Sequence, residues 1–261
     1  MRQKDSFRVW TAIAVAALVA VALGVFYFYQ REQAPESTDS VGVEAPPIAT
    51  TEPPRTVVVT TPPPERTIPL PPLDESDAEV RGGLTELFGR EAVQRFLVPE
   101  RIVRRIVVTI DNMPRAKMAL QQRPVQPTPG EFLTTGPEEA LVLAPENYAR
   151  YTPIVTVIGA TDAKTLVALY RGLQPLFQQA YEELGHPDSF FNTRLLEVID
   201  HLLSTPDVPA PIRLVQPGVF YKYADKDIEA LSSGRKLLIR MGPENAAIIK
   251  EKLREVQAEL I

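Results

Sequence analysis

The sequence predicts a mainly α protein in three parts: a single-pass N-terminal transmembrane helix, a proline-rich disordered tether, and a helical globular domain with one or two small β-hairpins. Three observations support this fold class. An uncharged apolar run fills residues 10–29, and eleven of the 26 prolines fall in residues 30–73. From residue 74 onward, apolar residues recur at helical spacing between glycine and proline boundaries. We therefore divide the chain into residues 1–9, 10–29, 30–73 and 74–261.

Composition narrows the chemistry that is open to the chain. It has 261 residues, a net charge of −5 and no cysteine. Without cysteine the chain has no disulfide, thiolate nucleophile or cysteine-ligated metal. The negative charge disfavours a general electrostatic grip on nucleic acid, so we expect no nucleic-acid partner.

The run from Trp10 to Tyr29 has the features of a membrane anchor. A helix of 20 residues spans about 30 Å, the thickness of the hydrocarbon core of a bilayer. Aromatic rings mark both ends, Trp10 at one and Tyr27 and Tyr29 at the other, where amphipathic rings favour the headgroup region. Residues 1–9 carry three cations against one acidic residue, which predicts a cytoplasmic tail and a folded domain on the other side of the membrane.

The alternative to an anchor is a cleaved signal peptide. Cleavage requires a short apolar core followed by small residues. Here the run ends in the bulky residues Phe26-Tyr27-Phe28-Tyr29. A buried core helix is a second alternative, but the run has no polar face. We therefore expect the segment to stay in the membrane.

The tether predicted at residues 30–73 is rich in proline, and threonine, serine, glutamate and valine make up much of the rest. Such a segment buries too little apolar surface to fold and leans towards polyproline II. Two stretches within it have other interpretations. The PLPPL sequence at 69–73 is a potential docking motif, although a stiff spacer is the commoner use. The TVVVTT sequence at 56–61 is β-prone, but prolines on both sides argue against a folded element.

The first half of the folded domain is predicted from caps and periodicity. Ser76 and Glu79 form the pattern of a capping box at the start of a helix that Gly89 ends. A short helix at 90–97 follows. The segment from Pro99 to Met113 has a helical apolar face, although its β-branched residues leave a strand as an alternative. Residues 132–143 resemble a hairpin.

The second half is predicted in the same way. A helix begins at Thr152, as N-cap, with Pro153 at its first position. Asp188 is expected to cap a helix that stops before Pro206. The other expected elements are a helix at 162–184 with Pro175 inside it, a second hairpin at 212–223, helices at 225–232 and 236–241, and a terminal helix from Pro243.

The sequence contains little that predicts catalysis. His186 lies in a turn and His201 on the polar side of a helix, and their spacing is not that of a helical metal pair. A Ser-His-Asp triad assembled in space stays open, because such triads are not sequence motifs. Asp225-Lys-Asp227 is typical of a solvated helix start. We predict no catalytic residue, no metal and no cofactor.

The most suggestive stretch for binding is Asn147-Tyr-Ala-Arg-Tyr151. Tyr148, Arg150 and Tyr151 are residue types that dominate binding hot spots. They directly precede the helix expected at Thr152, which would hold them rigidly. We predict that they form part of a partner-binding surface. The competing interpretation is that the two tyrosines pack on the core.

Four blocks of the sequence resemble a known family. They are NYARY at 147–151, HPDSFFNTRLLEVIDHLLSTP at 186–206, LVQPGVFYKYAD at 214–225 and LSSGRKLLIRMGPEN at 231–245. Together they resemble the bacterial envelope family catalogued as domain of unknown function 3014, over about residues 73–259. The resemblance implies a Gram-negative inner-membrane protein whose C-terminal domain faces the periplasm. It implies no activity and no catalytic residues.

The sequence leaves two hypotheses for the function of the protein, a binding module and an enzyme. The first is a non-enzymatic binding or scaffold module, held off the membrane by its tether, for a protein or cell-wall partner in the periplasm. The second is a membrane-anchored hydrolase or cell-wall-modifying enzyme that uses His186 or His201. A cleft that brings together a histidine, a carboxylate and a hydroxyl would favour the enzyme, whereas a large exposed patch would favour the binding module.

Overall fold

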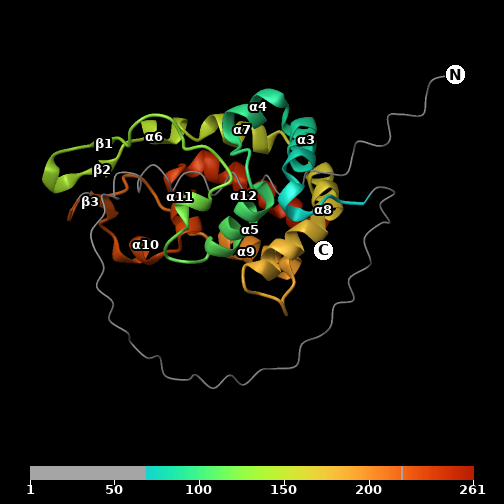
Figure 1. The fold of residues 1–261 in the computed structure, drawn as a ribbon. Coiled ribbons are helices and arrows are strands. Elements are labelled where there is room, and N and C mark those ends of the chain that lie inside the picture. Colours follow the sequence, from blue (N-terminus) through green and yellow to red (C-terminus); the bar gives the residue numbers. More distant parts are fainter. Residues whose placement is uncertain (1–68, 219) are drawn as a thin grey trace, which may run out of the picture.

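The computed structural model describes residues 69–218 and 220–261. Figure 1 shows these residues as a coloured ribbon. The predicted anchor at 10–29, and the predicted tether as far as residue 68, lie outside the described residues.

The described chain is mainly helical, as the sequence predicts. Its α-helices are α3 (Asp77–Phe88), α4 (Arg90–Phe96), α5 (Ile102–Asn112), α6 (Glu146–Ala149), α7 (Thr152–Gly159), α8 (Ala163–Glu183), α9 (Phe191–Leu203), α10 (Lys226–Ala230), α11 (Ser233–Arg240) and α12 (Pro243–Leu260). Short 3-10 turns are η2 (Leu73–Glu75), η3 (Leu120–Gln122) and η4 (Glu138–Ala140).

Both predicted hairpins are present. β1 (Thr134–Thr135) pairs antiparallel with β2 (Val142–Leu143), and β3 (Leu214–Val215) pairs antiparallel with β4 (Lys222–Tyr223). An isolated bridge between Val142 and Arg213 joins the two hairpins. They surround a small apolar cluster that includes Leu143, Leu214 and Tyr223. The β1–β2 hairpin projects from one end of the domain in Figure 1.

The main core lies where α8 and α12 meet the other helices. α8 packs against α5, α9 and α12, and α12 also packs against α7, α9 and α11. The buried face of α8 includes Leu166, Tyr170 and Phe177, and the rings of Tyr170 and Phe177 lie 5.7 Å apart. Each large apolar side chain that is fully buried contributes about 1.5–3 kcal/mol to folding. The helical periodicity of the sequence therefore marks the residues that hold the domain together.

The start of the domain corrects a predicted cap. Ser76 is the N-cap residue of α3, as predicted, but its side chain makes no capping hydrogen bond to that helix, and its hydroxyl instead donates to the carbonyl of Leu73, 2.7 Å away. Asp77 in the first turn of α3 caps a different helix, because its carboxylate accepts hydrogen bonds from the backbone N–H groups of Arg101 and Ile102 at 2.7 and 2.8 Å. α5 therefore begins at Ile102 and not at Pro99. The choice of helix over strand for this segment is confirmed.

Two further helix starts differ from the predictions. The N-cap of α7 is Tyr151, one residue before the expected Thr152. Asp188 does not cap α9, whose N-cap is Phe190. The amide of Gln178 on α8 holds this start instead, since its oxygen accepts from Phe191 N–H at 2.9 Å and its nitrogen donates to the Ser189 carbonyl at 3.0 Å. A side chain distant in sequence has taken the role of the local cap.

Within residues 69–218 and 220–261, no helix on its own has the length and apolar character needed to cross a membrane. α7 and α8 meet that criterion only when taken as a pair, and the bend between them is 87°.

Candidate functional site

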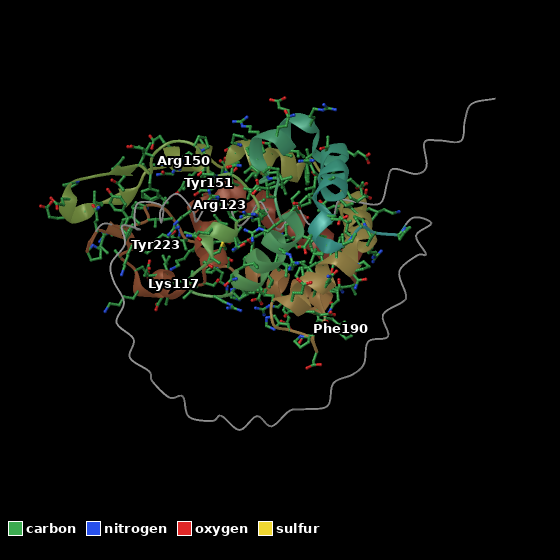
Figure 2. All side chains as sticks on the ribbon, viewed as in Figure 1. Lys117, Arg123, Arg150, Tyr151, Phe190 and Tyr223 are labelled. Carbon is green, nitrogen blue, oxygen red and sulfur yellow. The ribbon has the colours of Figure 1, made fainter. Side chains whose placement is uncertain are left out.

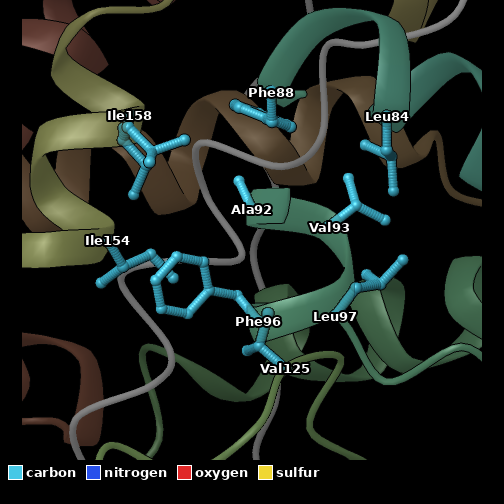
Figure 3. Close-up of a pocket in the computed structure, with 10 residues that line it drawn as sticks. Leu84, Phe88, Ala92, Val93, Phe96, Leu97, Val125, Ile154 and Ile158 are labelled. Atoms are coloured by element: carbon cyan, nitrogen blue, oxygen red, sulfur yellow. The ribbon is translucent and has the colours of Figure 1, made fainter. Parts of the chain in front are cut away.

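An apolar groove opens on the surface between α3, α4 and α7 (Figure 3). It has a cavity volume of about 50 Å³. Each lining residue is hydrophobic: Leu84, Phe88, Ala92, Val93, Phe96, Leu97, Val125, Ile154, Val157 and Ile158. The lining includes half-buried side chains from each of the three helices, among them Phe88, Phe96 and Val157. The groove therefore presents hydrocarbon to solvent on a wall built from three helices.

The local sequence explains why α4 stands apart from α3. Gly89 lies between the two helices with φ 81° and ψ 153°, a conformation that is essentially restricted to glycine. The chain turns there, and α4 begins at once with Arg90. Two turns of α4 then bring Ala92 and Phe96, four residues apart, onto the same face. This face is directed toward Ile154 and Ile158 of α7 (Figure 3).

The remaining wall comes from the irregular segment after α5. Leu97 and Val125 form an isolated antiparallel bridge. On either side of it, Val98 N–H donates to the Pro124 carbonyl at 2.8 Å, and Gln126 N–H donates to the Phe96 carbonyl at 2.7 Å. Val125 itself is 4% exposed. Backbone hydrogen bonds thus fix this segment against the end of α4, and the groove is a preformed feature.

Arg150 holds the continuation of the same segment. Its guanidinium donates to the carbonyls of Pro129 and Gly130 at 3.0 and 3.1 Å and to the Thr128 hydroxyl at 3.2 Å. It also donates to the side-chain oxygen of Asn147 at 3.3 Å. The segment that supplies Val125 to the groove is therefore tied, three residues further on, to α6 and α7.

The three residues predicted to bind a partner are placed together by α6 and the start of α7 (Figure 2 labels Arg150 and Tyr151). Tyr151 is 4% exposed, and burial raises the pKa of its hydroxyl. Tyr148 is half-buried, and burial also raises its pKa. The ring of Tyr148 lies against Gly242, the N-cap residue of α12. Arg150 is half-buried. The prediction that this surface binds a partner stays a prediction, and Tyr148 and Arg150 are its more accessible members.

His186 lies beside a buried carboxylate. Its ring stacks on Tyr181 with the centroids 4.5 Å apart, and its Nε2 is 4.0 Å from Asp111 Oδ2. The Asp111 side chain is 3% exposed and forms ion pairs with Arg115 and Arg194. Arg194 donates through Nε to Asp111 Oδ1 at 3.0 Å and so joins α9 to α5. This cluster has the arrangement of a structural ion-pair network, because its carboxylate is already shared by two guanidinium groups.

His201 lies beside a hydroxyl. Its Nε2 is 2.7 Å from Ser232 Oγ, and it is half-buried where a surface position was expected. Ser232 also caps α11 by accepting from Arg235 N–H at 3.3 Å. Burial lowers the pKa of His201, and nearby Arg235 and Arg194 lower it further. The charges that act on this histidine are thus cationic, opposite in sign to the carboxylate that orients a catalytic histidine.

Metal-binding side chains do not cluster in the part of the chain that the structure describes. There, no three histidine or acidic side chains lie close enough together to hold an ion.

Sequence reasoning found part of the groove and missed the rest. The helix that carries Leu84 and Phe88 was predicted from its start and from its end at Gly89, but those boundaries do not distinguish a groove wall from a wholly buried helix. Val125 stands alone among prolines and polar residues, so no local pattern marks it as a wall. A useful signal lay in α4, where Ala92, Val93, Phe96 and Leu97 are more apolar than a short surface helix needs.

Comparison with known proteins identifies the family and adds no function. No curated protein and no solved structure matches the chain. A family model described as protein of unknown function (DUF3014) matches residues 102–257, which is more than half of the 261 residues. The match begins later than the resemblance at residue 73 suggested, and it leaves α3 and α4 outside it. The chain therefore belongs to the DUF3014 family.

Proposed function

We propose that this protein is a non-enzymatic binding module of the bacterial envelope, anchored in the inner membrane by residues 10–29 and carrying its helical domain in the periplasm. The apolar groove between α3, α4 and α7 is the observation that supports a binding role. The uncharged run with cations before it supports the anchor and its orientation.

The chemistry of the groove favours a protein partner over a cell-wall glycan. Its ten lining residues include no charged and no hydroxyl-bearing side chain. Sugars are recognised through hydrogen bonds to their hydroxyl groups, and such a lining would leave those groups unpaired. Aliphatic or aromatic side chains of a peptide lose no hydrogen bonds there and gain from being removed from water. The partner is therefore a protein segment that presents bulky apolar side chains.

The affinity expected from the groove alone is modest. Two partner side chains that become fully buried contribute about 1.5–3 kcal/mol each. Association costs at least about 4 kcal/mol in lost translational and rotational freedom. Anchoring both proteins in one membrane raises their effective concentration and offsets part of that cost. A groove of modest affinity is therefore sufficient when both proteins are anchored in the same membrane.

A membrane-anchored hydrolase is the second candidate, and the close approach of His201 to Ser232 is what favours it. This pair is poorly suited to catalysis, because Ser232 is 8% exposed and its hydroxyl already caps α11. A direct test incubates the purified full chain with isolated peptidoglycan sacculi. Release of soluble fragments that His201→Gln abolishes would establish the enzyme and overturn the binding module.

The binding module is tested by photo-crosslinking in living cells. A photo-reactive amino acid replaces Ala92, which is half-buried in the groove, and the matched control replaces Gln94, which is exposed on the same helix. We expect a discrete protein adduct from position 92 that is absent from position 94. Phe96→Asp in the same chain should abolish it, because a buried carboxylate opposes apolar docking. Identical adducts from both positions would contradict the proposal.

A further inference from the structure

A second pocket lies between the end of α11, the start of α12 and the segment that follows α9. Its cavity volume is about 80 Å³, and it has no lining residue in common with the groove between α3, α4 and α7. Buried aliphatic side chains form its floor, namely Ile212, Leu238 and Ile239. Its two charged lining residues are Lys250 and Asp207. The pocket therefore combines hydrocarbon with charge, whereas the groove contains hydrocarbon alone.

Helix α12 positions the lysine. Pro243, Ala246 and Lys250 follow one another at intervals of three and four residues, so they lie on one face of this helix. The Lys250 side chain is 12% exposed. Its aliphatic stem is therefore covered along the pocket wall, an arrangement that lets a lysine pack its stem against hydrocarbon and still bring its ammonium to the rim.

The ammonium of Lys250 is fixed in place but keeps a free donor. Its Nζ donates to the Thr205 carbonyl at 2.9 Å and to Asp207 Oδ1 at 2.8 Å. Thr205 is itself held at the end of α9, because its hydroxyl donates to the Leu202 carbonyl at 2.6 Å. An ammonium has three N–H donors. The third donor of Lys250 has no partner within the described part of the chain.

The balance of charge in the pocket favours an anion. The Asp207 side chain is 99% exposed, so water competes for its carboxylate and a ligand carboxylate can replace it at little cost. Lys250, in contrast, is largely covered by protein. The N-terminus of α12, an 18-residue helix, adds partial positive charge at Gly242 and Pro243. The charges that the fold holds against the pocket are therefore positive.

We propose that this pocket binds a small aliphatic carboxylate, whose anion pairs with Lys250 and whose hydrocarbon packs on Ile212 and Ile239. The volume of the pocket sets the size of the hydrocarbon. An apolar cavity of about 150 Å³ holds benzene, so a pocket of about 80 Å³ accommodates about three or four carbon atoms. A free branched-chain acid and the C-terminal valine of a peptide share this chemistry. The site adds a ligand to the module and does not depend on the groove.

Methyl NMR of the full chain in detergent micelles, with isotope-labelled isoleucine methyl groups, tests the proposal. The probes are isovalerate and two analogues of the same shape, isoamyl alcohol and isoamylamine. We expect isovalerate to shift the methyl signals of Ile212 and Ile239 and to leave that of Ile106 in the main core unchanged. It should bind about tenfold more tightly than the alcohol, because a charge-assisted hydrogen bond is stronger than a neutral one.

Four variants assign the binding to named side chains. Lys250→Met should weaken isovalerate binding about tenfold and leave alcohol binding unchanged, a result that a purely structural role of Lys250 would not give. Asp207→Asn should tighten isovalerate binding, because it removes the competing carboxylate. Ala246→Leu fills the half-buried wall and should abolish the binding of both ligands, whereas Ala247→Leu at the next, exposed position should change neither.

Three results would overturn the proposal. They are equal affinity for isovalerate and the alcohol in the parent chain, tighter binding of the amine, and a preference for isovalerate that survives Lys250→Met. If Lys250→Met loses the alcohol as well, the pocket has collapsed and Asp207→Asn decides. Tighter binding of isovalerate by Asp207→Asn then supports the proposal, and unchanged or weaker binding contradicts it.

A tripeptide distinguishes the two sources of the carboxylate. Gly-Gly-Val and its C-terminal amide are titrated in the same way. If the tripeptide binds more tightly than isovalerate and the amide does not bind, the ligand is a chain terminus, and weaker binding of the tripeptide identifies a free acid. Equal binding of the tripeptide and its amide would contradict the role of Lys250. None of these outcomes bears on the adduct at Ala92, so this proposal and the proposed function fail independently.

Discussion

Replacing Gly242 with alanine tests how the start of α12 is packed. Gly242 has φ 83° and ψ 162°, and an added Cβ would lie 2.5–2.8 Å from three ring carbons of Tyr148. Gly89 is a matched control, because it has φ 81° and ψ 153° but no atom within 4 Å of an added Cβ. Both substitutions strain the backbone, and only one of them creates a clash.

The expected loss of stability in each variant follows from the backbone strain and from the clash with Tyr148. An alanine in this backbone region lowers the free energy of unfolding by about 1–3 kcal/mol, and this loss applies to both variants. Forcing extra volume against a packed ring costs about 1–3 kcal/mol more, which only Gly242→Ala loses. The clash cannot be relieved by a small rotation, because the ring carbons concerned include Cγ, at the base of the Tyr148 ring. We therefore expect Gly242→Ala to be the more destabilising by about 1–3 kcal/mol.

Urea denaturation and thermal melting of the two variants measure this difference. At about 2–4 °C per kcal/mol for a domain of this size, the melting temperatures should differ by several degrees. In a Tyr148→Ala background the excess cost of Gly242→Ala should disappear, since the ring is gone. Equal destabilisation by Gly242→Ala and Gly89→Ala in the parent chain would refute the packing of Tyr148 on α12. It would also leave Tyr148 free to serve a partner.

Three other predictions concern separate parts of the chain. Arg150→Ala should lower the free energy of unfolding by about 1–3 kcal/mol because it releases the segment at 128–130, and Arg90→Ala on the exposed start of α4 should change the urea midpoint little. For His201, whose pKa is lowered below 6.5 mainly by burial, the unfolded chain binds the proton more readily. Stability is therefore full above pH 6.5 and falls as the pH drops through the folded pKa, and His201→Gln should remove that part of the pH dependence of the urea midpoint. N-terminal sequencing of protein purified from membranes should begin at Met1 or Arg2, and a start beyond Gln30 would show that the segment at 10–29 is cleaved.

Periodicity was enough to predict most of the helices, because burial imposes it. It did not predict α6, and α11 begins at Ser233, three residues before the expected start. The apolar stripe of α8 survives as the buried face of the longest described helix, despite Pro175 within it. Proline and glycine boundaries placed α12 correctly, with Pro243 at its start. These signals are local: the residues that form the pattern are also the residues that adopt the structure.

Caps and the site were harder to predict, because their partners are distant in sequence. Asp188 is a good capping residue, yet the start of α9 is held by Gln178, and the start of α5 is likewise held by a distant residue, Asp77. The groove depends on Val125 meeting α4 through backbone bonds, which no single-sequence pattern encodes. Residue type alone did not distinguish the buried ring of Tyr151 from the half-buried ring of Tyr148, and the prediction that these two tyrosines and Arg150 bind a partner stays a prediction.

The position of α12 has a consequence for how the protein is made. Its residues Ile249, Leu253 and Val256 complete the buried surfaces of α7, α8 and α9, which precede it in the chain. During synthesis those three helices emerge first and expose apolar faces that α12 does not yet cover. The core can close only after α12 has been synthesised, so holding chaperones would be needed most in that interval. A premature stop codon before Ile249 would leave the same faces open permanently and send the chain to proteolysis.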